Sequence, residues 1–164
     1  MKRLILILAS LALLSPVAQA EYRNGSWSEA SIGMNAIINP QFQYQPMIKF
    51  GLGLDRIVLD AQFGFNLTTT VDSTLLQTVG IGAKIFVWNG PLWKIEDLQV
   101  FLIGTARSEA GTTDIDFKTG EIGAGVRPDF KVGNKVMTEF SAVWLAAQDI
   151  SAHFAVNAAI VFII

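Results

Sequence analysis

The chain has 164 residues, a formal net charge of -2, 51% apolar residues and 16% charged residues. Its charged fraction is well below the usual quarter and acids outnumber bases, so we expect no nucleic-acid partner. The sequence has no cysteine, which excludes disulfides and a cysteine-linked lipid anchor. No linker-like stretch divides the chain, so its length fits a single domain.

The N-terminal segment has the pattern of a secretory signal peptide. Lys2 and Arg3 precede an apolar run, and the small residue Ala20 suits cleavage. The run is shorter than the roughly 20 residues of a membrane helix. We therefore expect residues 1–20 to be a signal peptide and residues 21–164 to form one domain, with a charge of -4 once the two bases are removed. No later stretch is long enough for a membrane helix, which leaves a soluble globular domain or a membrane β-barrel.

From residue 30 onward, large apolar residues alternate with glycine or polar residues, which is the period of a strand with two different faces. Asp55 and Arg56 form a tight reversal between the second and third segments. The fifth segment is apolar on both faces around Phe101 and Ile103. In chain order, we predict strands over residues 30–38, 48–54, 59–67, 78–87, 98–107, 121–127, 136–145 and 153–162. Most approach the ~9–11 residues that a tilted strand needs to cross a hydrocarbon layer.

Eight strands place both ends of the domain on one side, where a chain threaded from the periplasm would leave them. Backbone groups in lipid also require a closed sheet without an edge. We expect the connections on the exterior side to be residues 39–46, 67–77, 108–118 and 146–150. On the other side, we expect turns at residues 55–56, 89–97 and 128–135.

The composition of the polar face indicates which face is outside. A soluble lipocalin-like barrel would show the same alternation with the faces reversed. Glycine weakens a solvated strand, but it leaves room inside a narrow barrel. The polar face carries glycine at positions 33, 51, 53, 64, 80, 82, 123 and 125. The sequence therefore predicts an all-β, eight-stranded antiparallel up-and-down transmembrane β-barrel with its apolar face toward lipid.

Charged residues also fall on the face that we assign to the lumen. The predicted charge network consists of Glu29, Lys49, Asp55, Asp60, Lys84, Arg107, Glu121, Arg127 and Glu139. With the reversal at Asp55 and Arg56, Lys49 is diagonal to Asp60 and within reach of a salt bridge. Charges in a narrow lumen are costly unless they are paired, so we predict an ionic plug. A small or gated pore that these charges tune is the alternative.

The four tryptophans lie near predicted strand ends. Trp27, Trp88 and Trp93 fall on the side of the termini, and Trp144 falls at the other rim. We predict that they are interface aromatics at the two membrane surfaces. Packing in the core of a soluble sandwich is the other interpretation.

Two segments invite a search for chemistry. Ser151 and His153 share one strand face, but positions i and i+2 are about 6–7 Å apart and Glu139 falls opposite Asn157, so no triad assembles. The acidic segment 114–121 has Lys118 and Thr119 where a calcium loop needs an oxygen ligand and glycine. We predict no catalytic residue, no metal site and no cofactor.

The signal peptide, the alternating strands, the Gly-lined polar face and the compact length together resemble the small outer-membrane barrels of the OmpA/OmpX type over residues 27–164. The resemblance implies an outer-membrane protein that contacts membrane lipids and lipopolysaccharide, and that depends on periplasmic chaperones and the barrel-assembly machinery. We expect a monomer with a structural or surface-interaction role. Lipid A-modifying barrels of the PagP and PagL families are the enzymatic alternative. The PagL type needs a lipid-facing His and Ser, whereas Ser151 and His153 are predicted to face inward.

Overall fold

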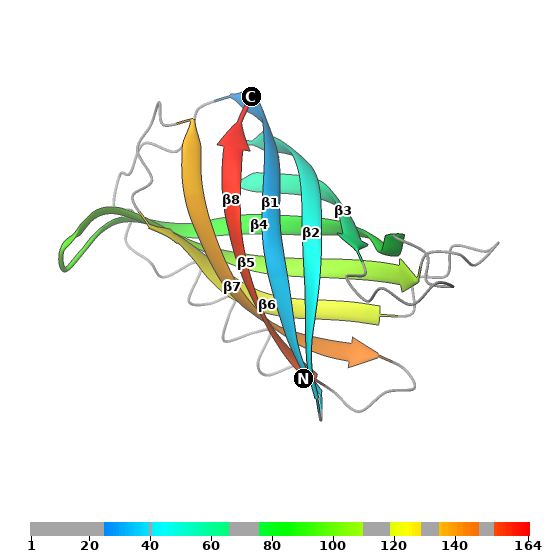
Figure 1. The fold of residues 1–164 in the computed structure, drawn as a ribbon. Coiled ribbons are helices and arrows are strands. Elements are labelled where there is room, and N and C mark those ends of the chain that lie inside the picture. The colour runs from blue at the N-terminus through cyan, green and yellow to red at the C-terminus, as the bar shows by residue number, and fades with distance from the viewer. Residues whose placement is uncertain (1–24, 40, 66–75, 110–118, 129–134, 148–152) are drawn as a thin grey trace, which may run out of the picture.

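A computed structural model describes residues 25–39, 41–65, 76–109, 119–128, 135–147 and 153–164. Its strands are β1 (Ser26–Asn39), β2 (Gln41–Leu54), β3 (Ile57–Phe65), β4 (Leu76–Leu92), β5 (Ile95–Glu109), β6 (Thr119–Pro128), β7 (Val136–Ala147) and β8 (His153–Ile163). Each strand pairs antiparallel with the next, and β8 returns to pair with β1, so the sheet closes (Figure 1). The predicted eight-stranded up-and-down architecture is confirmed. The predicted signal peptide lies outside the described residues.

The pairing register determines how far the strands lean from the barrel axis. Following the paired residues once around the barrel from Ser26 leads back to β1 at Ala36, ten residues further along. With a rise of about 3.3 Å per residue and strands about 4.8 Å apart, this shift corresponds to a tilt of roughly 40°. Figure 1 shows the tilt as the steep crossing of β1 in front over β4 behind.

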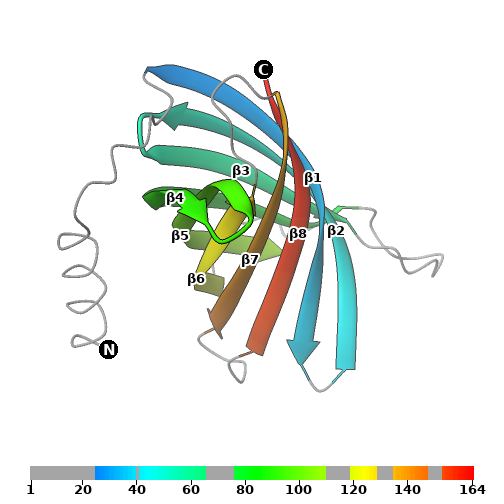
Figure 2. The same ribbon diagram turned by 90° about the vertical axis from the view of Figure 1, so that its left-hand side faces the viewer.

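The two faces of the strands separate as the sequence predicts. On β3, Ile57 and Leu59 are exposed on the outer surface, whereas Val58 and Asp60 are buried in the interior. The same alternation continues along β7, β8, β1 and β2, which lie side by side in one wall of the barrel (Figure 2). β-Branched and aromatic residues dominate the outer positions, where they fit the pleated surface.

Two predicted connections are wrong because they belong to strands. Residues 39–46 fall largely in β1 and β2, and residues 89–97 mostly form the end of a long β4–β5 hairpin that turns at Trp93 and Lys94. The pairing of β4 with β5 shifts at two irregular positions, so the period of two is lost there although pairing continues. None of the described segments forms a helix that could cross a bilayer.

Candidate functional site: the barrel interior

Four buried charges from four different strands meet inside the barrel, and we call Glu29, Lys84, Arg127 and Glu139 the four-charge cluster. Lys84 Nζ donates to Glu29 Oε1 at 2.7 Å and to Glu139 Oε2 at 3.0 Å. The Arg127 guanidinium donates to both Glu29 oxygens at 2.8 and 2.9 Å and, through Nε, to Glu139 Oε2 at 2.7 Å. Each cation therefore bridges both carboxylates, which is the geometry that makes buried charges tolerable.

Aromatic rings lie directly beside this cluster. Phe86 and Phe101 pack edge to face with their centroids 5.6 Å apart. The Arg127 guanidinium lies 4.9 Å from the Phe86 centroid, and Lys84 Nζ lies 5.8 Å from the Phe101 centroid. Both cations thus also contact the face of a ring, which favours a positive charge.

Glycines on neighbouring strands make room for these side chains. A Cβ at Gly51 would lie 2.9 Å from Val58 Cγ1 and 3.0 Å from Glu29 Cγ. A Cβ at Gly125 would collide with the Phe101 ring. Because a narrow barrel has little interior volume, the large residues of the lumen require glycine on the strands that face them.

A second cluster lies on β3, β5 and β6 and consists of Asp60, Gln62, Thr105, Arg107 and Glu121. Arg107 Nη2 pairs with Glu121 Oε2 at 3.0 Å and contacts Gln62 Oε1 at 3.5 Å. Thr105 Oγ1 also donates to Glu121, and Gln62 Nε2 donates to Asp60 Oδ1 at 2.7 Å. This arrangement is a chain of single contacts, unlike the doubly bridged four-charge cluster.

The second cluster and the amide side chains near it leave polar atoms without a protein partner. The buried atoms concerned are Asn35 Nδ2 and Oδ1, Asp60 Oδ2, Arg107 Nε, Glu121 Oε1 and Asn157 Oδ1. Trp27 Nε1, Asn89 Oδ1 and Gln99 Oε1 also have no protein partner, and Gln99 lies opposite Arg127 of the four-charge cluster. Buried polar groups in folded proteins are nearly always hydrogen-bonded, to water where no protein group is available. We therefore expect ordered water in this part of the lumen.

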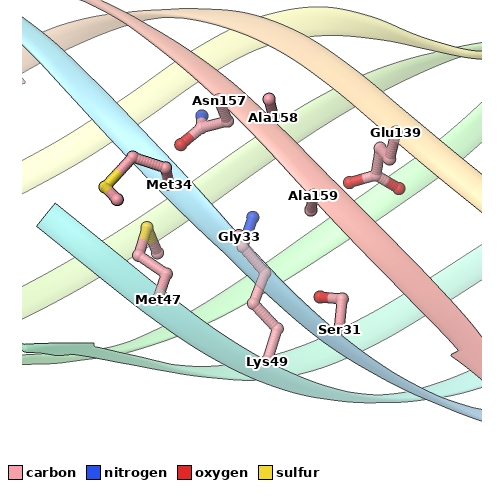
Figure 3. Close-up of a pocket in the computed structure, with 9 residues that line it drawn as sticks. All are labelled: Ser31, Gly33, Met34, Met47, Lys49, Glu139, Asn157, Ala158 and Ala159. Atoms are coloured by element: carbon pink, nitrogen blue, oxygen red, sulfur yellow. The ribbon is translucent and has the colours of Figure 1, made fainter.

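A small cavity lies between Lys49 and Asn157, and Figure 3 shows the residues of β2, β1, β8 and β7 that line it. Its volume of about 10 Å³ is close to the space that one water molecule needs. The described lumen charges balance, with Glu29, Asp60, Glu121 and Glu139 opposing Lys49, Lys84, Arg107 and Arg127. A neutral lumen with unpaired acceptors suits water better than a bound cation.

The structure places the predicted charge network as follows. Eight of the nine residues are buried on the inward face, and Asp55 is the exception. Asp55 occupies the β2–β3 turn with φ 50°, is exposed, and its Oδ1 accepts from the Gly25 N–H. A residue in a turn leaves the alternation of the strand, so the inward assignment of Asp55 is wrong.

The β2–β3 register is the one predicted, with Lys49 opposite Gln62 and Gly51 opposite Asp60. Within the described strands, however, Lys49 forms no ion pair with Asp60, whose Oδ1 accepts from Gln62 instead. The predicted register of β2 and β3 is therefore correct, but Lys49 and Asp60 do not form the ion pair that it suggested.

The tryptophans occupy three different environments. Trp27 lies at the strand end, but its ring faces inward over Gly53, so it does not belong to a lipid-facing ring of aromatics. Trp88 is half-buried, whereas Trp144 on the outer wall is 56% exposed and Trp93 at the hairpin tip is 92% exposed. The prediction missed Tyr44, which is 63% exposed on β2, because residues 39–46 were assigned to a loop.

The residues considered for catalysis from the sequence are described only in part. Ser151 lies outside them, and of His153 only the backbone is described, so the side-chain pair is not placed. Most of the acidic segment 114–121 also lies outside. Among the side chains that are described, no group of three or more His, Asp or Glu residues could hold a metal ion.

Comparisons with known proteins concern the fold. No family model matches the chain. No curated protein matches it. Among solved structures, it is similar to the N-terminal β-barrel domain of OprF from Pseudomonas aeruginosa, with a TM-score of 0.50 and 11% identity over 86% of this chain and 98% of that chain. At this identity the likeness shows the fold alone, and it agrees with the expected OmpA-like barrel.

Proposed function

We propose that this chain is an integral protein of the bacterial outer membrane, whose strands cross the bilayer and whose lumen is closed by an ionic plug. One observation carries the proposal: the barrel is apolar outside and charged inside. Large apolar side chains are exposed on every strand except β5, whose outward Val100 and Leu102 are half-buried. Examples from the seven strands are Ile32, Leu52, Leu59, Ile81, Ile122, Phe140 and Ile160.

The height of the apolar surface fits a bilayer. On β2, exposed large apolar side chains are described from Tyr44 to Leu54, ten residues apart. With the roughly 40° tilt, ten residues span about 25 Å along the barrel axis, which equals the apolar band of outer-membrane barrels. Tyr44 and Trp144 then lie near one edge of this band, where amphipathic rings favour the interface.

A soluble barrel with a ligand cavity is the alternative interpretation of the same strand pattern. Such a protein would expose its polar face to water and rarely leaves extensive apolar surface uncovered. Here Lys84 and Arg127 are only 1% exposed, while Leu52 is 70% exposed. Lipid removes the cost of that exposed apolar surface, whereas water does not.

The closure of the lumen rests on the four-charge cluster. Its members come from β1, β4, β6 and β7, so the contacts cross the interior rather than run along one wall. Removing one member leaves the others buried with fewer charged partners, which opposes spontaneous opening. The plug favours a structural or surface-interaction role over transport.

Biogenesis follows from membrane insertion. The protein contacts outer-membrane lipids and lipopolysaccharide, and periplasmic chaperones and the barrel-assembly machinery deliver it as a monomer. Its outer surface, with Phe154 and Ile160 exposed on β8, requires protection from water before insertion.

Refolding the mature chain into phosphatidylcholine vesicles tests the proposal. We expect a compact form that migrates differently on a gel before and after heating. In planar bilayers, the refolded protein should give no reproducible single-channel steps. Reproducible steps would contradict the plug and support a narrow pore through the hydrated second cluster, while failure to fold with lipid would contradict membrane insertion.

A further inference from the structure

The β4–β5 hairpin extends beyond the wall of the barrel. β3 ends its pairing with β4 at Ile57 and Ile85, and β5 begins its pairing with β6 at Leu98. Between these points, in the described part of the chain, the two strands pair only with each other as far as a two-residue turn. Figure 1 shows this ribbon projecting from the side of the barrel with a curled end. We call residues 87–97 the hairpin tip.

The turn itself holds an unusual residue. Trp93 has φ 53°, in the left-handed region that bulky side chains rarely adopt. Its side chain is 92% exposed, and the Lys94 ammonium lies 5.4 Å from its ring centroid. A two-residue hairpin turn requires a positive φ, and Asp55 in the β2–β3 turn has φ 50° as well, so the unusual feature at Trp93 is the bulk of its side chain. No described part of the barrel covers the ring, which leaves it open to contact with its surroundings.

The form of the tip argues against a strand from another protein as that partner. The β4–β5 register shifts between Phe86 and Trp88 and again between Gly90 and Leu92. These irregularities bend and twist the ribbon, and Pro91 has no N–H to donate at this edge. Irregular edges and proline are devices that prevent strand addition.

Lipid headgroups match the chemistry of the tip. Tryptophan partitions to the membrane interface, where its apolar ring and its N–H both find partners. The lysine ammonium beside it can reach a phosphate while its stem stays on apolar surface. Glu96 and Asp97 follow on β5, so the tip has a net charge of -1 and should favour zwitterionic over anionic lipid.

The tip is also continuous with the proposed lipid band. Trp88 pairs with Val100 on the outer wall at the end of the barrel where β1 begins and β8 ends. The register shifts that follow bend the ribbon, and Figure 1 shows it leaving the barrel sideways. We propose that the hairpin tip is a lateral membrane anchor, with Trp93 and Lys94 in the phosphate-bearing headgroup layer on the side of the termini. This inference rests on the proposed membrane location.

Quenching by brominated lipid tests the anchor. Two single-tryptophan proteins, retaining Trp93 or Trp144 with phenylalanine at the other three positions, are refolded into phosphatidylcholine vesicles brominated near the glycerol or near the chain ends. We expect Trp93 to be quenched mainly by the shallow bromines. We expect lipid to quench Trp144 as well, because Trp144 lies on the outer wall. If a single-tryptophan protein lacks the heat-dependent gel shift, it has not folded. In that case, the difference in bromine quenching between the full chain and Trp93→Phe reports the quenching of Trp93.

The outcomes separate the anchor from the membrane proposal. Quenching of Trp144 together with water-like emission and no lipid quenching of Trp93 would overturn the anchor and leave the membrane proposal standing. Absence of quenching for both residues would overturn both.

A charge reversal tests the headgroup contact itself. We expect Lys94→Glu to lower the ratio of lipid-contacting to water-exposed Trp93 by up to roughly fivefold, which is the effect of losing one exposed ion pair. The matched control Lys135→Glu, an exposed residue just before β7, should leave that ratio unchanged. Equal quenching in Lys94→Glu and the unaltered protein would overturn the contact with phosphate.

Discussion

On β2, Lys49 and Gly51 face the barrel interior, while Phe50 and Leu52 on the same strand face outward. The inner and outer faces of these strands differ in which kind of side chain is buried and which is exposed. Inside, charges are buried and held by one another. Outside, large apolar groups are exposed, and only their surroundings can stabilise them. The stability of such a barrel depends as much on its solvent as on its own contacts.

The two clusters on the inner face also differ in how their charges are paired. In the four-charge cluster, Lys84 and Arg127 each reach both carboxylates. In the second cluster, Arg107 has one ion-pair partner, Glu121, and polar atoms remain for water. We expect the four-charge cluster to be rigid and the protein to lose stability when a member is replaced. We expect the second cluster to tolerate a replacement better, because water can take the place of a lost contact.

The largest effect is expected from Arg127→Met. The change leaves Glu29 and Glu139 buried with Lys84 as their only shared cation, which should lower the free energy of unfolding by about 3–5 kcal/mol. Urea titration of the protein refolded in vesicles measures it. Lys135→Met, at an exposed position, should stay within about 0.5 kcal/mol. A loss below about 1 kcal/mol for Arg127→Met would mean that the four-charge cluster does not determine the stability of the barrel.

A charge on the outer face should be nearly as damaging, but only at the right depth. Ile32 lies near the middle of the apolar band, and Leu54 lies at its edge. We expect Ile32→Arg to cost about 2–4 kcal/mol and Leu54→Arg about 0–1 kcal/mol in lipid. Equal costs for the two variants in the urea titration would indicate that the outer face meets water.

Glycine on the two faces should respond differently to an added methyl group. A Cβ at Gly125 would collide with the Phe101 ring and approach the Phe140 carbonyl, whereas a Cβ at outward Gly104 meets only Glu121 O at 3.9 Å. We expect Gly125→Ala to cost about 1–3 kcal/mol and Gly104→Ala less than about 0.5 kcal/mol. The same unfolding assay checks this pair, and a reversed order would contradict the assigned facing.

The smallest effect is expected in the second cluster. Arg107→Met removes one ion pair with Glu121, which still accepts from Thr105. We expect ordered water beside the polar atoms that have no protein partner there to replace the lost contact, so the loss should be about 1–2 kcal/mol. If Arg107→Met destabilises as much as Arg127→Met, the distinction between the two clusters disappears.

The strand pattern was predictable from sequence where the period of two is regular. On β2 and β3, the turn, the facing and the register all follow from alternation around Asp55 and Arg56. The β4–β5 hairpin was not predictable because two irregular pairings interrupt the period, so residues 89–97 resembled a loop. The inward ring of Trp27 was predictable as well, because Trp27 lies two residues before the inward Glu29, but from the sequence we assigned it to the membrane interface.

The inward residues were predictable, but their partners were not. Alternation assigns Glu29 and Lys84 to the lumen, yet they are 55 residues apart on strands that are not neighbours. Their contact exists only because the sheet closes with a particular tilt, which brings opposite walls together. The diagonal rule that links Lys49 to Asp60 applies within one wall, so it could not identify contacts across the lumen.

Membrane fractionation of cells that express the full chain tests the central claim most directly. If the outer face meets lipid, the mature protein stays with the outer-membrane fraction through osmotic shock and salt washing, and detergent releases it. Recovery of the folded protein in the soluble fraction after osmotic shock, without detergent, would contradict the account.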